Sequence, residues 1–113
     1  MPYINLDIEN KHEIIPGFVA QCLHTTNNTI AKVNITKGSS LPTHQHPHEQ
    51  ITYLISGELM FTINNENKIM QPGMCAVVPS NAPHSATAVK DCVVLDIFSP
   101  TREDFKLLLN NNK

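Results

Sequence analysis

The sequence predicts an all-β fold, an antiparallel sandwich or barrel with one short helix at its C-terminal end. Eight prolines and four glycines divide the 113 residues into short segments, most of which are rich in β-branched residues. Many short strands separated by turn signals are typical of antiparallel sandwiches and barrels. The length is that of one domain, 1–113. The apolar fraction of 41% suffices for a hydrophobic core.

Nine segments are expected to be strands, because each joins β-branched or aromatic residues to flanking turn residues. In the third of them, Ile30, Lys32 and Asn34 alternate with Ala31 and Val33, the pattern of a strand buried on one face. The turns between the segments fall at 26–28, 37–40, 56–57, 64–67, 72–73 and 80–83. The expected strands are Tyr3–Ile8, Gly17–Thr25, Thr29–Thr36, His48–Ile55, Glu58–Ile63, Lys68–Met70, Met74–Val78, His84–Ala88 and Val93–Phe98.

The end of the chain carries the signals of a helix. Ser99 and Pro100 supply a cap and a proline near the first turn, and early carboxylates follow them. Thr101 and Asp104 resemble a capping box. The apolar face of this helix is expected to consist of Phe105, Leu108 and Leu109.

Charge and cysteine content exclude several classes of protein. The net charge is −2, and no basic stripe indicates a nucleic-acid partner. No apolar run reaches the roughly 18 residues that cross a membrane, and no secretory signal is visible. The cysteines are Cys22, Cys75 and Cys92, an odd number without a CxxC pair, and they are expected to be reduced thiols. These features predict a cytoplasmic protein.

Histidine is the unusual component, and four of the six histidines lie between residues 41 and 84. If the first of these segments is extended, His44, His46, His48 and Gln50 point to one face and Glu49 to the other. In a barrel that face is the interior, where imidazoles without a partner are costly. A divalent metal is their natural partner. An exposed loop of solvated histidines is the alternative.

A second segment adds another histidine. Residues 72–84 read as a turn, an apolar strand, a second turn and then His84. The two proline turns, at 72–73 and 80–83, are spaced to place His84 opposite the first histidine segment. A structural histidine at the start of a strand is the other interpretation.

Together the two segments resemble the cupin family. The first cupin motif is a glycine, five residues, HxH, three or four residues, Glu, six residues and a glycine. The second is a glycine, five residues, PxG, two residues, His, three residues and Asn. The matching residues are Gly38, His44, His46, Gln50 and Gly57 for the first motif, and Gly73, Pro79, Asn81, His84 and Ala88 for the second.

Three positions depart from the family pattern: Gln50 replaces Glu, Asn81 replaces a glycine and Ala88 replaces Asn. Asn81 is a mild change, because asparagine also tolerates positive φ. The resemblance implies a cupin double-stranded β-helix, a jelly-roll barrel, around one divalent ion of nickel, zinc, manganese or iron. Glu49 is placed outside the ligand set and His48 near the rim of the pocket. The implied metal ligands are His44, His46, Gln50 and His84.

The glutamine affects the expected chemistry. A neutral amide beside three imidazoles leaves the full +2 charge on the ion, whereas a glutamate would reduce it to +1. Gln50 therefore favours Lewis-acid chemistry over iron redox chemistry.

Asp96 is the one acidic residue in an otherwise apolar expected strand, so it needs a partner or a role. A structural contact of Asp96 with Arg102 or with the backbone is one interpretation. A functional role is the other, because an arginine near a helix N-terminus is unfavourable for the helix dipole.

Residues 95–105, together with 44–54 and 79–84, are similar to the pectin-degradation cupins of the KdgF type. Those proteins speed the ring opening of 4,5-unsaturated uronates, released from pectin or alginate, to 5-keto-4-deoxyuronate. The resemblance implies that Arg102 binds the uronate carboxylate and that Asp96 transfers protons at the enol ether or ring oxygen. It also implies that Phe98 packs on the sugar face, and we expect His48 beside the substrate.

The leading hypothesis is thus a metal-dependent lyase or isomerase that acts on a small acidic sugar. An iron-dependent cupin dioxygenase, a non-catalytic metal- or sugar-binding module and a structural barrel with an empty site are the alternatives. The expected strand Tyr3–Ile8 has no hairpin partner, and a free sheet edge needs to be covered. We therefore predict a homodimer with this strand at or near the interface.

Overall fold

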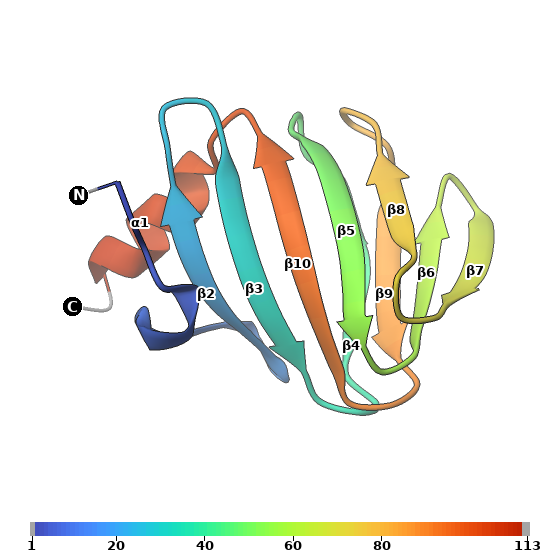
Figure 1. The fold of residues 1–113 in the computed structure, drawn as a ribbon. Helices are drawn as coiled ribbons and strands as arrows, with labels where there is room; N and C mark the ends of the chain where they lie inside the picture. Colours follow the sequence, from blue (N-terminus) through green and yellow to red (C-terminus); the bar gives the residue numbers. More distant parts are fainter. Residues whose placement is uncertain (1, 112–113) are drawn as a thin grey trace.

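The structure, a computed structural model, describes residues 2–111, with side chains up to residue 107 in the C-terminal helix. In this part of the chain, ten strands form two antiparallel sheets that enclose the hydrophobic core, and one helix follows them (Figure 1). The first sheet has the order β1 (His12–Ile15), β2 (Phe18–His24), β3 (Thr29–Ile35), β10 (Cys92–Ser99), β5 (Glu49–Ser56) and β8 (Cys75–Val78). The second has the order β4 (Ser40–His44), β9 (His84–Ala88), β6 (Leu59–Ile63) and β7 (Glu66–Met70).

The predicted all-β fold is confirmed, and the predicted strands from residue 17 onward agree with the structure to within two residues at each end. Burial alternates along β3, where Ala31, Val33 and Ile35 are buried and Asn34 is exposed, as its sequence predicts. This alternation gives the first sheet an inner face that packs on the second sheet. The largest fully buried apolar side chains are Leu54, Leu59, Met70 and Val78.

Strand register brings distant parts of the chain together inside the barrel. β10 lies between β3 and β5, and its residues Asp96 and Phe98 pair with Thr52 and Gln50 of β5. All four side chains belong to the series that points inward. In the other sheet, His44 at the end of β4 pairs with the first residue of β9. Polar side chains from two sheets thus face one interior space.

Turn geometry explains two residues of the motifs, Gly57 and Asn81. Gly57 has a φ of +97°, and a Cβ atom there would lie 2.2 Å from the carbonyl oxygen of Asp91. A larger residue would therefore be strained and would collide with backbone. Asn81 has a φ of 63°, which agrees with the expectation that asparagine can replace a glycine at this turn.

The N-terminal prediction was wrong in detail. Residues 3–8 do not form a strand, because the Asn5 side chain accepts a hydrogen bond from the backbone of Asp7 and starts a 3-10 helix, η1 (Leu6–Ile8). Two strands, β1 and β4, were not predicted. β4 contains Pro42 and is mostly exposed or half-buried, so it lacks the alternation that marks a strand.

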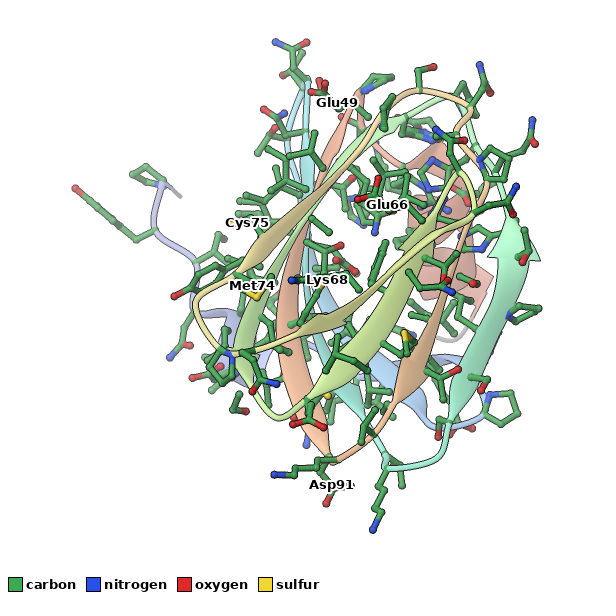
Figure 2. The ribbon with its side chains drawn as sticks, turned by 90° about the vertical axis from the view of Figure 1, so that its right-hand side faces the viewer. Glu49, Glu66, Lys68, Met74, Cys75 and Asp91 are labelled. Carbon is green, nitrogen blue, oxygen red and sulfur yellow. The ribbon has the colours of Figure 1, made fainter. Side chains whose placement is uncertain are left out.

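The barrel has an open side at the edge strands. β8 and β7 stand at the ends of their sheets, and Figure 2 looks onto them, with Cys75 on β8 and Lys68 on β7. A groove of about 300 Å³ runs between these strands, and Phe61, Met70 and Ala76 contribute to its lining.

The predicted C-terminal helix is present as α1 (Glu103–Asn111). The expected capping box is absent, because the Thr101 hydroxyl donates instead to the carbonyl oxygen of Thr25, 2.7 Å away, and Asp104 pairs with Arg102. The predicted apolar residues Leu108 and Leu109 have side chains outside the described part. Among the described residues, no helix is long and apolar enough to span a membrane.

Candidate functional site

Three histidines from separate segments meet at one end of the barrel interior. His44 ends β4, His46 lies in the loop before β5, and His84 begins β9. Their candidate ligand nitrogens all lie within 4.8 Å of one another. The ring centroids of His44 and His84 are 4.1 Å apart, and those of His46 and His84 are 4.9 Å apart. The structure therefore brings together the three histidines that both sequence segments contributed.

Backbone carbonyls define which nitrogen of each ring carries the hydrogen. His44 Nδ1 lies 2.9 Å from the oxygen of Pro42, and His84 Nδ1 lies 2.9 Å from the oxygen of Ala82. A carbonyl oxygen only accepts, so each Nδ1 must donate. In a neutral ring, Nε2 is then a bare lone pair. This is the arrangement in which a histidine binds a metal through Nε2.

His84 provides the test of whether a metal fits. Its Nε2 is buried and has no hydrogen-bond partner among the described residues. Burial lowers the pKa of His84 to about 4, and burial also lowers the pKa of His46. Both rings are neutral at pH 7. A buried lone pair without a partner is costly, and a divalent cation would satisfy it.

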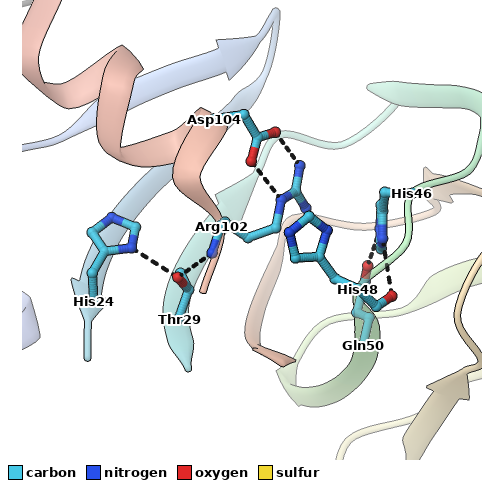
Figure 3. Close-up of polar contacts among 7 residues, drawn as sticks. All are labelled: His24, Thr29, His46, His48, Gln50, Arg102 and Asp104. Carbon is cyan, nitrogen blue, oxygen red and sulfur yellow. Dashed lines mark hydrogen bonds and ion pairs between the residues drawn. The ribbon is translucent and has the colours of Figure 1, made fainter. Parts of the chain in front are cut away.

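Gln50 adds an oxygen to this cluster. Its Oε1 lies 3.1 Å from His46 Nε2, while His46 Nδ1 lies 3.1 Å from the carbonyl oxygen of His48 (Figure 3). A neutral His46 has one N–H and faces two oxygens, so one of these contacts has no hydrogen. Ligand atoms about 2.1 Å from a shared ion lie about 3.0–3.4 Å apart. His46 and Gln50 therefore fit a common metal ion.

Glu49 and His48, the two residues before Gln50, lie outside the histidine cluster. Glu49 is exposed and has the opposite parity to Gln50, in line with its expected place outside the cluster. His48 is half-buried, and its ring centroid lies 5.4 Å from that of His46 and 6.5 Å from that of Phe98. His48 thus stands beside the cluster.

A cavity of about 170 Å³ extends from His44 and Gln50 toward the C-terminal helix, and its lining residues do not include His46, His48 and His84. Its wall is mainly apolar, with Phe18, Val33 and Phe61 among the lining residues. Most of the predicted site residues also line it. The polar and aromatic members near the cluster are His44, Gln50, Thr52, Asp96, Phe98, Arg102 and Phe105.

Asp96 contacts Thr52, and no direct contact with Arg102 is observed. The Thr52 hydroxyl donates to Asp96 Oδ1 over 2.6 Å. Burial raises the pKa of Asp96 to about 6, while the Thr52 hydrogen bond and the charge of Arg102 act against this rise. In place of the structural Asp96–Arg102 contact, which was one interpretation of the sequence, the Asp96 carboxyl group has Thr52 as its partner and lies in the cavity wall.

Arg102 is buried and held on several sides. Its Nε and Nη2 donate to the two carboxylate oxygens of Asp104 over 2.9 and 2.7 Å (Figure 3). Its guanidinium carbon lies 4.6 Å from the ring centroid of Phe98 and 3.9 Å from that of Phe105. The backbone N–H of Arg102 donates to the Thr29 hydroxyl. The guanidinium is therefore fixed at the wall of the cavity.

Sequence reasoning missed three residues of this site. Thr52 has the same inward parity as Gln50, and this parity is a signal that could have revealed it. Asp104 and Phe105 were interpreted only as helix residues. Their contacts with Arg102 depend on the turn between β10 and α1, which no local pattern specifies.

Known proteins resemble this chain in both sequence and structure. The Cupin domain family matches residues 31–98, whereas no curated protein matches the chain significantly. The structure of KdgF from Halomonas sp. is 31% identical, and the match covers 91% of this chain and 97% of that chain with a TM-score of 0.84. An RmlC-like cupin from Shewanella frigidimarina NCIMB 400 is 26% identical over 93% of this chain and 96% of that chain, with a TM-score of 0.88.

A more distant likeness concerns the fold alone. A salicylate 1,2-dioxygenase from Pseudaminobacter salicylatoxidans is 17% identical, covers 75% of this chain and 27% of its own, and has a TM-score of 0.72. The family match spans more than half of the chain, and both histidine segments lie within it. The chain belongs to the cupin domain family.

Proposed function

We propose that the protein is a metal-dependent enzyme that opens the ring of 4,5-unsaturated uronates to give linear 5-keto-4-deoxyuronate. The observation that carries this proposal is one cavity bordered by a cluster of metal-binding atoms, an acid of raised pKa and a buried arginine. The likeness to KdgF from Halomonas supports the same substrate class.

In this proposal His44, His46, His84 and Gln50 hold one divalent ion, which supplies Lewis-acid chemistry at a substrate oxygen. The neutral amide of Gln50 leaves the positive charge of the ion intact. Nickel, zinc, manganese and iron(II) are all compatible with nitrogen and amide ligands.

Arg102 binds the uronate carboxylate. Asp104 occupies the edge of the guanidinium formed by Nε and Nη2, which leaves the Nη1 hydrogens and one Nη2 hydrogen for a second carboxylate. Phe98 packs on the sugar face, since its ring lies between Arg102 and His46. His48 contacts the substrate from the neighbouring loop.

Asp96 transfers protons at the enol ether or ring oxygen of the substrate: ring opening is an isomerisation, so a proton that the carboxylate takes from the substrate is returned to it. A pKa of about 6 lets the carboxyl group gain and lose a proton near neutral pH. Its hydrogen bond to Thr52 holds it in the cavity wall, on the same side as Gln50.

An iron-dependent dioxygenase is the second candidate, since three histidines also suit iron(II). Oxygen uptake with a substrate would support it over ring opening. A module that only binds metal or sugar would hold its ligand tightly without turnover.

We also place the protein in the cytoplasm, in keeping with the three cysteines, all of which are free.

The metal proposal predicts one divalent ion per chain. Removal of a residue that supports a metal ligand costs about 10–100-fold in affinity, so loss of a ligand itself should cost at least about 100-fold. Protein purified without a histidine tag, stripped with chelator and titrated with Ni²⁺ or Zn²⁺, is expected to show this loss in His46→Ala. His24→Gln, which lies outside the cluster, should bind like the wild type. Full metal content in His46→Ala would remove the assignment.

The proton-transfer role predicts opposite effects of Asp96→Asn on activity and on stability. Turnover of unsaturated galacturonate, followed by its loss of ultraviolet absorbance, should fall by about 10²–10⁴-fold with metal content retained. The folded pKa of about 6 exceeds the ordinary value of 3.8, so the ionised carboxylate costs stability above pH 6, and this cost disappears toward pH 3.8.

Metal-free Asp96→Asn should therefore melt above the wild type at pH 8, and the difference should shrink at pH 5. Unchanged kinetics would contradict the proton-transfer role. A lower melting temperature at both values of pH would mark Asp96 as a packing residue.

The carboxylate-binding role predicts that Arg102→Ala acts mainly on KM. Removal of one member of a buried charge pair costs roughly 2–5 kcal/mol. Arg102→Lys keeps the charge but loses the paired donors, so its KM should lie between those of Arg102→Ala and the wild type. Melting curves on the same preparations provide the control. Lower melting temperatures with unchanged activity per folded molecule would assign Arg102 to bracing α1.

We further propose a homodimer with residues 3–8 at or near the interface. Tyr3 and Ile8 are 85% and 78% exposed, and the outer face of the first sheet exposes Tyr53, Ile55 and Val77. Light scattering at micromolar concentration is expected to give twice the chain mass, and Tyr3→Ser with Ile8→Ser should weaken the pair. A monomeric wild type would overturn this proposal.

A further inference from the structure

Thr52 is a buried polar residue whose hydrogen bond to Gln50 has no part in the proposed function. It lies on β5, two residues after Gln50, and pairs across the sheet with Asp96 on β10. Its exposed fraction is 1%. Its hydroxyl oxygen accepts from Gln50 Nε2 over 2.8 Å and donates to Asp96 Oδ1 over 2.6 Å. One side chain thus joins a candidate metal ligand to the candidate proton-transfer residue.

The direction of each hydrogen bond is determined by the number of available hydrogens. An ionised Asp96 has none, so the single hydroxyl hydrogen of Thr52 must point to Oδ1. Toward Gln50, the Thr52 oxygen then offers only a lone pair. The group of Gln50 that faces Thr52 must therefore be its NH₂.

This assignment determines what Gln50 presents to the histidines. With NH₂ directed at Thr52, Oε1 is the atom that lies 3.1 Å from His46 Nε2. The two ends of a glutamine amide have almost the same shape, so packing alone does not distinguish them. A flipped amide would point N–H groups at a cation and would place two acceptors against each other at Thr52.

We infer that Thr52 is a positioning residue, which orients the Gln50 amide with its oxygen toward the histidine cluster and holds Asp96 in the same chain of hydrogen bonds. The inference rests on the proposed function, in which Gln50 is a metal ligand. Substitution of a residue that hydrogen-bonds a metal ligand typically lowers metal affinity by about 10–100-fold.

The β-branch of threonine contributes to this role. Its restricted χ1 keeps the hydroxyl in one direction, and its methyl group fills space in the core. Thr52→Val preserves the shape and removes the hydroxyl. Thr52→Ser retains the hydroxyl with more rotational freedom. These two variants separate hydrogen bonding from packing.

The test is titration of metal-free protein with Ni²⁺ or Zn²⁺ at pH 8, where Asp96 is ionised. Thr52→Val should bind about 10–100-fold more weakly than the wild type, and Thr52→Ser should recover most of this loss. Thr29→Val is the matched control, because Thr29 is also fully buried and its hydroxyl contacts His24 and the Arg102 backbone, outside the cluster. Its metal affinity should equal that of the wild type.

A double-mutant comparison shows whether Thr52 acts through Gln50. In a Gln50→Ala background, Thr52→Val should cause no further loss of metal affinity. A wild type that binds metal and a Thr52→Val variant of equal affinity would overturn the inference, and so would a full additional loss in the Gln50→Ala background. If these binding results hold and unsaturated galacturonate is not turned over, the proposed substrate fails and the inference stands.

Discussion

Four acceptor atoms, one nitrogen from each of the three clustered histidines and the amide oxygen of Gln50, converge inside the barrel. Too few hydrogens are available to pair with them, and much of the architecture holds this arrangement. The carbonyl oxygens of Pro42 in β4 and of Ala82 before β9 accept hydrogen bonds from Nδ1 of His44 and His84. The amide of Gln50 directs its oxygen to the same point. Lone pairs brought this close are unfavourable in a low-dielectric interior unless a cation lies among them. The arrangement is therefore one that a positive ion would stabilise.

The sequence predicted those elements whose side chains alternate between the core and solvent. β3 is the clearest case, since each of its inward residues is β-branched or small. The same rule failed at β4, where Pro42 interrupts the pattern and the strand is defined by pairing with β9. It also failed at residues 3–8, where an asparagine side chain starts a turn within an apolar segment. In both places a specific contact determines the local structure, strand pairing at β4 and a side-chain hydrogen bond at residues 3–8, and amino-acid composition does not reveal it.

At the site, motif spacing located the histidines and Gln50 but not the residues that orient them. Thr52 and Asp104 are ordinary residues in an ordinary strand and helix, and their contacts arise only when β10 packs beside β5 and α1 turns back over the cavity. The Asp96–Arg102 contact, which was one interpretation of the sequence, shows the same limit. Charge drew attention to both residues, yet each has another partner within closer reach.

The segment that carries Arg102 has a further consequence. The cupin family match ends at residue 98, so the histidines, Gln50 and Asp96 lie within it, while Arg102, Asp104 and Phe105 lie beyond it. In the proposed function, the residues that would hold the ion and the arginine that would bind the substrate carboxylate thus belong to separate stretches of the chain. Exchange of the short segment after β10 would therefore alter the substrate preference of such a barrel while the candidate metal ligands stay in place.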